Sequence, residues 1–420
     1  MNRYPCDLSL SLSTRATIVA IGLAGWLAGV VAMAQEPAEA EHPLAFIHTA
    51  FENASPVNWE IRDDGTVDVF LLYDYERASP NRAAGHWHFR VEGREGARIT
   101  LVLNNLLNVW NRRPGSVARE ETISFVSVDG RSWRPVEMEL LEGHRLQLEL
   151  TMEAEAMYVA RLEPYRLSDL DRFLEANGGD PLVEITTIGE TVEGRPLEIV
   201  RVGCDDAPHR IVIRCRAHPW EPGGNWVVEG LVERLLAGDG DAQGYLDRYA
   251  LYIMPIANKD GVARGMTRFN VEGMDLNRNW DQPADPCRAP ENAALEEWIE
   301  SMHAAGRRID LLIDFHNDDY GALHISRPEG DIEAYLSLMA RYEALLREHT
   351  WFTEGSTGSG FRNPGSIGEG LLERYGIAAC VQELNANWIA GLDDFPSAAL
   401  WHTFGEQLAE VYYRLFASEE

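Results

Sequence analysis

The amino-acid sequence predicts an α/β domain with a largely parallel or mixed sheet over residues 165–420, preceded by an antiparallel β-sandwich over residues 44–164. Short β-rich runs separated by turn residues predict the sandwich. Apolar strands that alternate with long helical stretches predict the α/β part. The chain has 420 residues, 45% hydrophobic and 25% charged, so it is long enough and apolar enough to form two ordinary globular cores.

Residues 1–34 have the pattern of a secretory signal peptide. Arg3 and Arg15 flank a polar start, an uncharged apolar run follows over residues 16–31, and Ala32–Ala34 is a small-x-small cleavage site. An uncleaved membrane anchor is the alternative, because the apolar run is about long enough to span a bilayer. We expect cleavage, and therefore a periplasmic or secreted protein with no membrane segment after cleavage.

The first half of the predicted mature chain reads as short strands. They are Val67–Tyr73, Trp87–Val91, Ile99–Leu103, Ser124–Val126 and Leu146–Leu150. Asp129-Gly130 and Glu142-Gly143 stand where hairpin turns are needed. Glycine readily adopts the positive-φ backbone conformation that such turns require. His86 and His88 alternate along one strand with no third donor near them, so we interpret both as structural residues rather than metal ligands.

The second half alternates between helices and buried-type strands. It begins with a helix predicted over residues 168–177, where Ser168 is the expected N-cap residue. The predicted strands are Ile211–Cys215, Leu251–Pro255, Leu311–Phe315 and Ile377–Val381. The predicted long helices are Gly224–Leu236, Pro290–His303, Asp331–Glu348 and Ala398–Phe416. This alternation is typical of an α/β domain.

The charge of the chain excludes some partners. The formal net charge is −30, and cleavage after residue 34 leaves 35 basic and 66 acidic residues, a formal charge of −31. Such acidity argues against nucleic acid and anionic membranes as partners. It does not identify a substrate, and the oligomeric state stays open.

Four cysteines follow the predicted signal. Cys204, Cys215, Cys287 and Cys380 are an even number, compatible with one or two disulfides in an oxidising compartment, but the sequence does not pair them. No two have C-x-x-C spacing, so we do not expect a cysteine zinc site, and we expect the cysteines to be buried or bridged.

Potential metal ligands lie at the ends of two predicted strands. The strand at 211–215 runs into His218 and Glu221, and the strand at 311–315 runs into His316. The crevice of an open α/β sheet lies beyond the carboxyl ends of its strands. Two imidazoles and one carboxylate, with a fourth position open for water, are the arrangement expected of catalytic zinc.

Five motifs in order resemble the zinc carboxypeptidase family. They are the H-x-x-E pair His218/Glu221, Asn258–Gly261 as N-x-D-G, Asp275–Trp280 as D-x-N-R-x-W, the strand-terminal His316 and the late strand-terminal Glu383. The resemblance implies a mixed, eight-stranded type of sheet flanked by helices. It also implies one zinc ion on His218, Glu221 and His316, and a peptide substrate with a free C-terminal carboxylate.

The resemblance also implies a role for each site residue. Glu383 would be the general base for a zinc-activated water, and Arg268 would stabilise the developing oxyanion. Asn277 and Arg278 would bind the terminal carboxylate of the substrate. Asp275 would accept the second ring N–H of His218 and fix its tautomer.

The β-sandwich, its W-x-F-R-V strand and residues 188–197 resemble the cytosolic-carboxypeptidase-like subfamily in particular. One departure concerns a loop tyrosine that the family generally has before its catalytic glutamate. Here residues 355–367 contain Phe361 and no tyrosine. We therefore expect altered recognition of the substrate terminus, and Arg362 and Arg374 stay unassigned as candidates for a basic side-chain pocket.

Two other functions stay open at this point. The same ligands would serve an amidase or deacylase that acts on a non-peptide amide bearing a carboxylate. Alternatively, the chain would be a non-catalytic binding protein whose β-sandwich recognises a partner. Activity towards peptides compared with N-acyl amino acids separates a peptidase from an amidase, and binding of a wall or peptide ligand without turnover would indicate the binding protein.

Overall fold

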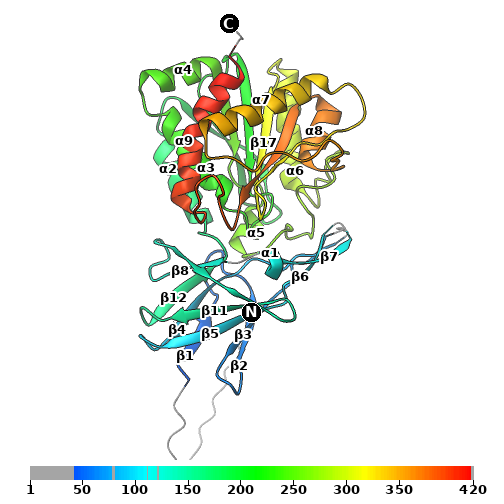
Figure 1. The fold of residues 1–420 in the computed structure, drawn as a ribbon. Coiled ribbons are helices and arrows are strands. Elements are labelled where there is room, and N and C mark those ends of the chain that lie inside the picture. The colour runs from blue at the N-terminus through cyan, green and yellow to red at the C-terminus, as the bar shows by residue number, and fades with distance from the viewer. Residues whose placement is uncertain (1–41, 78–80, 111, 121–122, 418–420) are drawn as a thin grey trace, which may run out of the picture. The chain divides into compact units, whose positions relative to one another are not determined.

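The computed structural model describes residues 42–77, 81–110, 112–120 and 123–417 (Figure 1). The predicted signal peptide at residues 1–34 lies outside this part of the chain. Among the described residues, no helix combines the length and the apolar character needed to cross a membrane.

The first half of the described chain forms two five-stranded sheets. One has the order β1-β4-β12-β8-β9 and the other β10-β11-β5-β3-β2. The bounds are β1 (Leu44–His48), β2 (Val57–Ile61), β3 (Val67–Leu71), β4 (His88–Gly93), β5 (Arg98–Asn104), β8 (Ile123–Ser127), β9 (Arg134–Glu137), β10 (Glu139–Leu141), β11 (Arg145–Thr151) and β12 (Ala156–Ala160). Side chains of both sheets share one apolar core. The predicted sandwich is thus confirmed, whereas its boundary at residues 164/165 stays a prediction.

Pairing in these sheets is antiparallel except between β3 and β5. The chain leaves β3 for β4 in the other sheet and then returns to β5, and this crossover makes the two neighbours run in the same direction. The predicted hairpin turns are present between β8 and β9 and between β10 and β11, where Gly130 and Gly143 have φ of +69° and +78°. A hairpin of β6 (Leu107–Trp110) and β7 (Arg113–Ser116) leads into the short helix α1 (Val117–Glu120).

The second half forms a mixed sheet with the order β13-β14-β16-β15-β17-β19-β18. The bounds are β13 (Val183–Glu190), β14 (Pro196–Val202), β15 (His209–Cys215), β16 (Tyr249–Met254), β17 (Leu311–Asp318), β18 (Leu323–His324) and β19 (Ala378–Asn385). Strands β16, β15, β17 and β19 are parallel, and the others are antiparallel to their neighbours. All four predicted strands of this half are confirmed.

The sheet has seven strands in the described residues, one fewer than the resemblance implied. Beyond the edge strand β18, the next segment pairs only through the isolated bridge between Leu323 and Ser356. Gly355 has φ of +85°, which turns the backbone out of the extended conformation beside that bridge. The eighth strand is therefore reduced to a single pair of residues.

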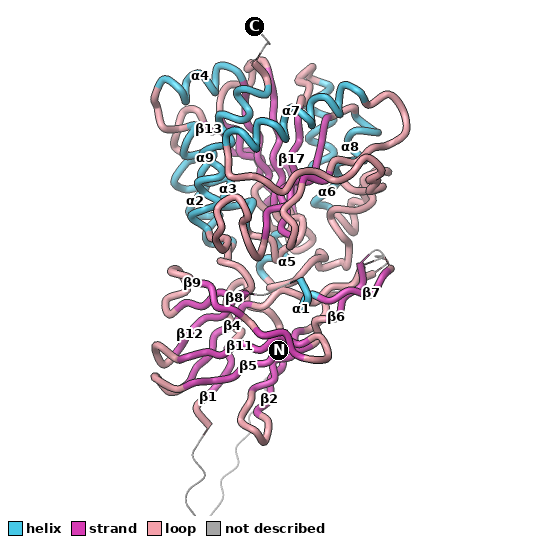
Figure 2. Tube along the Cα trace, in the orientation of Figure 1, coloured by secondary structure: helices cyan, strands magenta, loops and turns pink. Residues whose placement is uncertain are grey.

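Helices cover both faces of the mixed sheet (Figures 1 and 2). The bounds are α2 (Leu167–Asn177), α3 (Gly223–Leu235), α4 (Gly240–Arg248), α5 (Lys259–Ala263), α6 (Pro290–Ala304), α7 (Glu333–His349), α8 (Ile367–Tyr375) and α9 (Ala398–Leu415). Ile211 and Ile213 pack towards the face that holds α3, α7 and α9, whereas Val212 packs towards α6 and α8. Both faces of the central strands are therefore buried, as parallel strands require.

Two details of the sequence prediction need correction. Helix α2 begins with Arg166 as its N-cap residue rather than Ser168, because the Asp169 carboxylate accepts the Arg166 backbone N–H at 2.6 Å and so extends the first turn. The four described cysteines are all free, and Cys204 and Cys287 are exposed, so the expectation of buried or bridged cysteines is wrong for these two. Cys215 and Cys380 are buried on β15 and β19, and β17 lies between those strands, so these two thiols are too far apart to bond.

Candidate active site

Three parallel strands end at one edge of the mixed sheet, and the predicted site residues lie there. His218 and Glu221 occupy the turn between β15 and α3. His316 belongs to β17 and Glu383 to β19, and these two residues are paired directly across the ladder. Because the carboxyl ends of parallel strands form the ligand crevice of an α/β sheet, this register brings the predicted ligands and the predicted base together.

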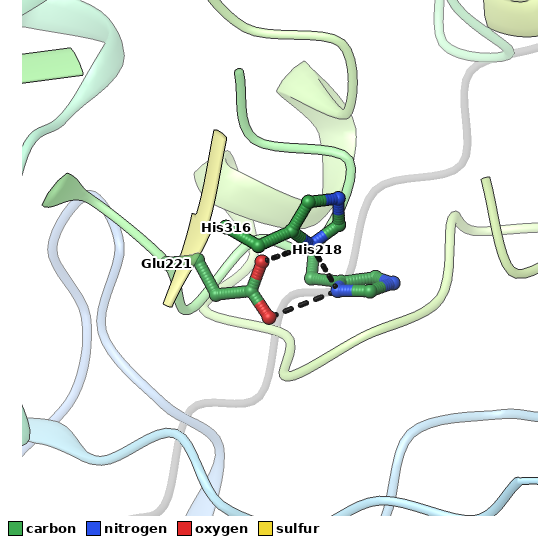
Figure 3. A group of neighbouring side chains, drawn as sticks. All are labelled: His218, Glu221 and His316. Atoms are coloured by element: carbon green, nitrogen blue, oxygen red, sulfur yellow. Dashed lines mark hydrogen bonds and ion pairs between the residues drawn. The ribbon is translucent and has the colours of Figure 1, made fainter. Parts of the chain in front are cut away.

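The side chains of His218, Glu221 and His316 converge on one point (Figure 3). His218 Nδ1 lies 2.9 Å from Glu221 Oε1, and His316 Nδ1 lies 2.7 Å from Glu221 Oε2. The two Nδ1 atoms are 3.1 Å apart. All three residues are at most 3% exposed, and Glu221 Oε2 accepts no hydrogen bond. Two imidazole nitrogens and a buried carboxylate oxygen that lacks a donor fit a divalent cation, and this donor set suits zinc.

Carboxylates hold the far nitrogen of each histidine. His218 Nε2 lies 3.1 Å from Asp275 Oδ1, as the sequence predicted, and His316 Nε2 lies 2.6 Å from Asp314 Oδ2. Because each carboxylate can accept the Nε2–H, the Nδ1 atom of each ring is the one that faces the metal position. Asp314 in turn receives two hydrogen bonds from the buried Arg214, at 2.8 and 2.6 Å.

The sequence analysis missed Asp314. The residue stands two positions before His316 inside a run that reads as an apolar strand. The D-x-H spacing places both side chains on one face of β17. A buried acid in such a strand, beside a predicted metal ligand, was the signal that could have identified it.

The electrostatics of the group also favour a cation. Burial alone would raise the pKa of Glu221, but His218 and His316 outweigh burial and lower the pKa to about 2. Burial would likewise raise the pKa of Asp275, but Arg268 and the other cations around it hold the pKa well below its usual value of 3.8. The carboxylates are therefore ionised at neutral pH, which is the form that binds a metal.

Glu383 lies in a cavity of about 490 Å³ that also contains the three converging residues. It is 9% exposed, and its Oε2 has no hydrogen-bond partner. Burial and then the Asp318 carboxylate raise the pKa of Glu383 well above its usual value of 4.5. His324 Nδ1 stands 3.7 Å from Glu383 Oε1, and the sequence analysis assigned no role to His324 or Asp318. A carboxylate that holds a proton readily is suited to general-base chemistry.

The remaining predicted residues line the same cavity or support it. Arg268, Asn277 and Arg278 all line the cavity, and Arg268 Nε donates to Asp275 Oδ2 at 2.7 Å. Asn277 Oδ1 accepts the Ile367 N–H at 3.0 Å, so part of its hydrogen-bonding capacity is used within the protein. Arg278 NH1 donates to the Asn277 carbonyl at 2.7 Å.

Phe361 and Tyr320 are two aromatic side chains that line the cavity. Tyr320 belongs to the loop after β17 and is 72% exposed. Arg362 also lines the cavity, but its guanidinium binds the buried carboxylate of Glu369. Of the two unassigned arginines, Arg362 lines the cavity and Arg374 does not.

The structure supports the interpretation of His86 and His88 as structural residues. His86 Nε2 lies 3.2 Å from the Asn53 carbonyl, and His88 Nδ1 lies 3.1 Å from Asn53 Oδ1. Neither belongs to a group of potential metal ligands in the described part of the chain. Burial lowers the pKa of His86 to about 3, so its ring is neutral in the fold.

A buried site of two histidines and one glutamate beside an open cavity, at the carboxyl edge of a mixed α/β sheet, is the arrangement expected of catalytic zinc. The zinc carboxypeptidase family profile matches residues 175–350. Residues 175–350 thus carry a zinc carboxypeptidase domain, which confirms the resemblance for this part of the chain. Glu383 lies beyond the matched residues, so its assignment depends on the geometry above.

A solved structure is similar to this chain in fold, and two curated proteins are similar to it in sequence over part of their length. A metallo-carboxypeptidase from Burkholderia cenocepacia has a TM-score of 0.78 and 24% identity, and the similarity covers 89% of this chain and 100% of that one. Cytosolic carboxypeptidase 2 of Xenopus tropicalis is 27% identical over 204 residues, which are 45% of this chain and 20% of the relative. An uncharacterized protein of Zymomonas mobilis is 25% identical over 279 residues, 65% of each chain. The matched segments thus span less than two thirds of these two relatives.

Proposed function

We propose that this protein is an exported metallocarboxypeptidase, with one zinc ion on His218, Glu221 and His316, that removes the C-terminal amino acid of a peptide, including branched or cell-wall-derived peptides. The position of Glu383 in one cavity with the three converging ligands supports the proposal most strongly. Zinc in such a site lowers the pKa of a bound water and polarises a carbonyl.

In the proposed reaction, Glu383 takes a proton from water while the water oxygen bonds to the carbonyl carbon of the last peptide bond. The same carboxyl group then passes the proton to the amide nitrogen as the C–N bond breaks. The products are a shortened peptide with a new carboxylate and a free amino acid. The buried, readily protonated carboxyl of Glu383 suits both halves of this transfer.

Two arginines complete the proposed site. The Arg268 guanidinium, fixed by Asp275 at 2.7 Å, would stabilise the oxyanion that appears only in the transition state. Arg278, which is mostly buried in the cavity wall, would bind the terminal carboxylate together with Asn277. A terminal carboxylate bound there would direct the last peptide bond to the metal position.

Export is part of the proposal and depends on residues 1–34 alone. Expression of the full chain, followed by separation of periplasm, membrane and cytosol, tests it. We expect a soluble exported form whose first residue is Gln35. A product that begins at Met1 in the membrane fraction would support the anchor instead.

A substrate comparison tests the hydrolase class. The mature protein, loaded with zinc, is incubated with peptides that differ in their last residue and, separately, with N-acyl amino acids that carry the same residue. Release from peptides supports the carboxypeptidase. Release from the N-acyl amino acids alone would support an amidase, and tight peptide binding without release would support a binding protein.

A further inference from the structure

One carboxylate from the first half of the chain binds three successive backbone N–H groups in the second half. Asp74 Oδ1 accepts the Thr267 N–H at 2.9 Å. Asp74 Oδ2 accepts the Arg268 N–H at 2.5 Å and the Phe269 N–H at 3.1 Å. Hydrogen bonds from amides to an ionised carboxylate are roughly twice as strong as neutral ones. The backbone on both sides of Arg268 is therefore held by a single side chain, and we call these contacts the Asp74 clamp.

A second set of contacts holds the same segment. Thr267 Oγ1 accepts the N–H groups of Gly85 and His86, both at 3.1 Å. The Thr267 carbonyl accepts the N–H of Trp220 at 3.4 Å, and Trp220 lies between the two metal ligands of the H-x-x-E pair. The segment that carries Arg268 is thus tied to the β-sandwich on one side and to the ligand turn on the other.

The Arg268 side chain has few other supports. Its Nε donates to Asp275, and its guanidinium carbon lies 5.4 Å from the centre of the Trp110 ring. Asp275 Oδ1 also holds His218, so this carboxylate links the arginine to the metal position. A shift of the Arg268 backbone would therefore move the guanidinium against two neighbours and out of its place in the cavity.

We propose that Asp74 is a positioning residue for the reaction, because its carboxylate fixes the backbone of residues 267–269 and thereby the position of the Arg268 guanidinium in the catalytic cavity. The inference rests on the proposed function, in which Arg268 stabilises the oxyanion. It assigns the β-sandwich a part in catalysis, since Asp74 follows β3 of that region. A displacement of about 1 Å at such a group is enough to cost orders of magnitude in rate.

The charge state of Asp74 is consistent with this role. Burial raises the pKa of Asp74, and the three N–H donors lower it, but burial has the larger effect, so the pKa is raised to about 6. The group is therefore ionised at neutral pH and can accept all three hydrogen bonds. Burying the Asp74 carboxylate costs free energy, and the three hydrogen bonds from the backbone N–H groups offset that cost.

A double-mutant cycle tests the clamp. Asp74→Asn keeps the size of the side chain but turns an NH2 group towards one of the backbone N–H groups. We expect kcat to fall about 10-fold with KM within about 2-fold, since the oxyanion forms only in the transition state. In an Arg268→Ala background, which itself lowers kcat about 100-fold, Asp74→Asn should add less than about 2-fold.

Asp68→Asn is the matched control. Asp68 is a carboxylate of β3 that is 1% exposed and binds Arg62 and Asn104, none of which lines the cavity. We expect this control to affect stability but not kcat. An equal loss from Asp74→Asn with and without Arg268, or no loss from it in folded protein, would overturn the inference. Asp74→Glu, which keeps the charge, should recover part of the kcat lost in Asp74→Asn.

Amide hydrogen exchange of the wild-type protein tests the Asp74 clamp without an activity assay and without a variant. The amides of Thr267, Arg268 and Phe269 should exchange at least about 100-fold more slowly than amides of exposed loops. Rapid exchange of these three would contradict the clamp. If the wild-type protein releases no amino acid from peptides yet shows this protection, the proposed function fails and the clamp stands.

Discussion

The substitution Asp314→Asn tests how much the carboxylate behind His316 contributes. Asp314 and Arg214 are both fully buried, and their two hydrogen bonds measure 2.8 and 2.6 Å. Burial alone would raise the pKa of Asp314, but Arg214 and His316 hold it well below 3.8. The amide leaves a buried guanidinium with no negative partner, and breaking a buried ion pair in this way costs about 3–5 kcal/mol.

The same change affects metal binding. An amide at position 314 can donate to His316 Nε2, which would place the ring proton on Nδ1 and block the ligand atom. Loss of such an orienting group lowers metal affinity about 10–100-fold, or about 1.4–2.7 kcal/mol. We therefore expect zinc affinity to fall by that factor, measured by competition with a chromophoric chelator.

Stability is measured separately by urea unfolding in excess chelator, so that metal loss does not contribute. Asp310→Asn is the control, because Asp310 directly precedes β17 and its side chain is 30% exposed and contacts His209 and the Arg210 N–H. We expect the control to lose about 1 kcal/mol or less. Folded Asp314→Asn protein that binds zinc within 2-fold of the wild type would refute the role assigned to Asp314.

Three further changes have defined outcomes. Burial lowers the pKa of His86 from 6.5 to about 3. Between these two pH values the unfolded chain binds a proton at His86 that the folded protein does not, so the free energy of unfolding decreases as the pH falls from 6.5 towards 3. The loss of stability amounts to roughly 2 kcal/mol at pH 5. Urea unfolding at pH 7 and pH 5 should therefore show a smaller loss of stability on acidification for His86→Gln than for the wild type, and an equal loss in both would contradict the lowered pKa of His86. Gly230→Ala places a Cβ 1.9 Å from the His402 carbonyl oxygen between α3 and α9, so thermal unfolding should show a loss of about 1–3 kcal/mol, whereas Gly244→Ala meets nothing within 4 Å and should be neutral or stabilising. Arg278→Ala should lower kcat/KM on peptides about 10–100-fold, and less on peptides whose terminal carboxylate is amidated; an equal loss on both would argue against carboxylate binding.

Much of the site could be predicted because its residues stand in short motifs at the ends of apolar strands. His218, Glu221 and His316 are brought together by strand register, which the alternation of strands and helices already predicts. Asp74 could not be predicted, since its partners lie 193 to 195 residues further along the chain and only the packed structure brings them to it.

The fold shows the same division. Apolar strands such as β15 and β17 are evident in the sequence, whereas β2 is short and largely exposed, and its alternation of apolar and polar residues was not assigned to a strand. The eighth strand of the mixed sheet was expected from the resemblance, but beyond β18 the described chain pairs only at the isolated bridge between Leu323 and Ser356, next to Gly355 with its φ of +85°.

The central claim is that zinc bound by His218, Glu221 and His316 and the carboxylate of Glu383 together release C-terminal amino acids. The most direct measurement is release from a peptide library by the mature protein, with and without chelator, beside Glu383→Gln. We predict release that the chelator abolishes and zinc restores, and a loss of at least about 1000-fold in Glu383→Gln protein that still binds one zinc per chain. Release that survives in Glu383→Gln protein, or none from any peptide by zinc-loaded wild-type protein, would contradict the account.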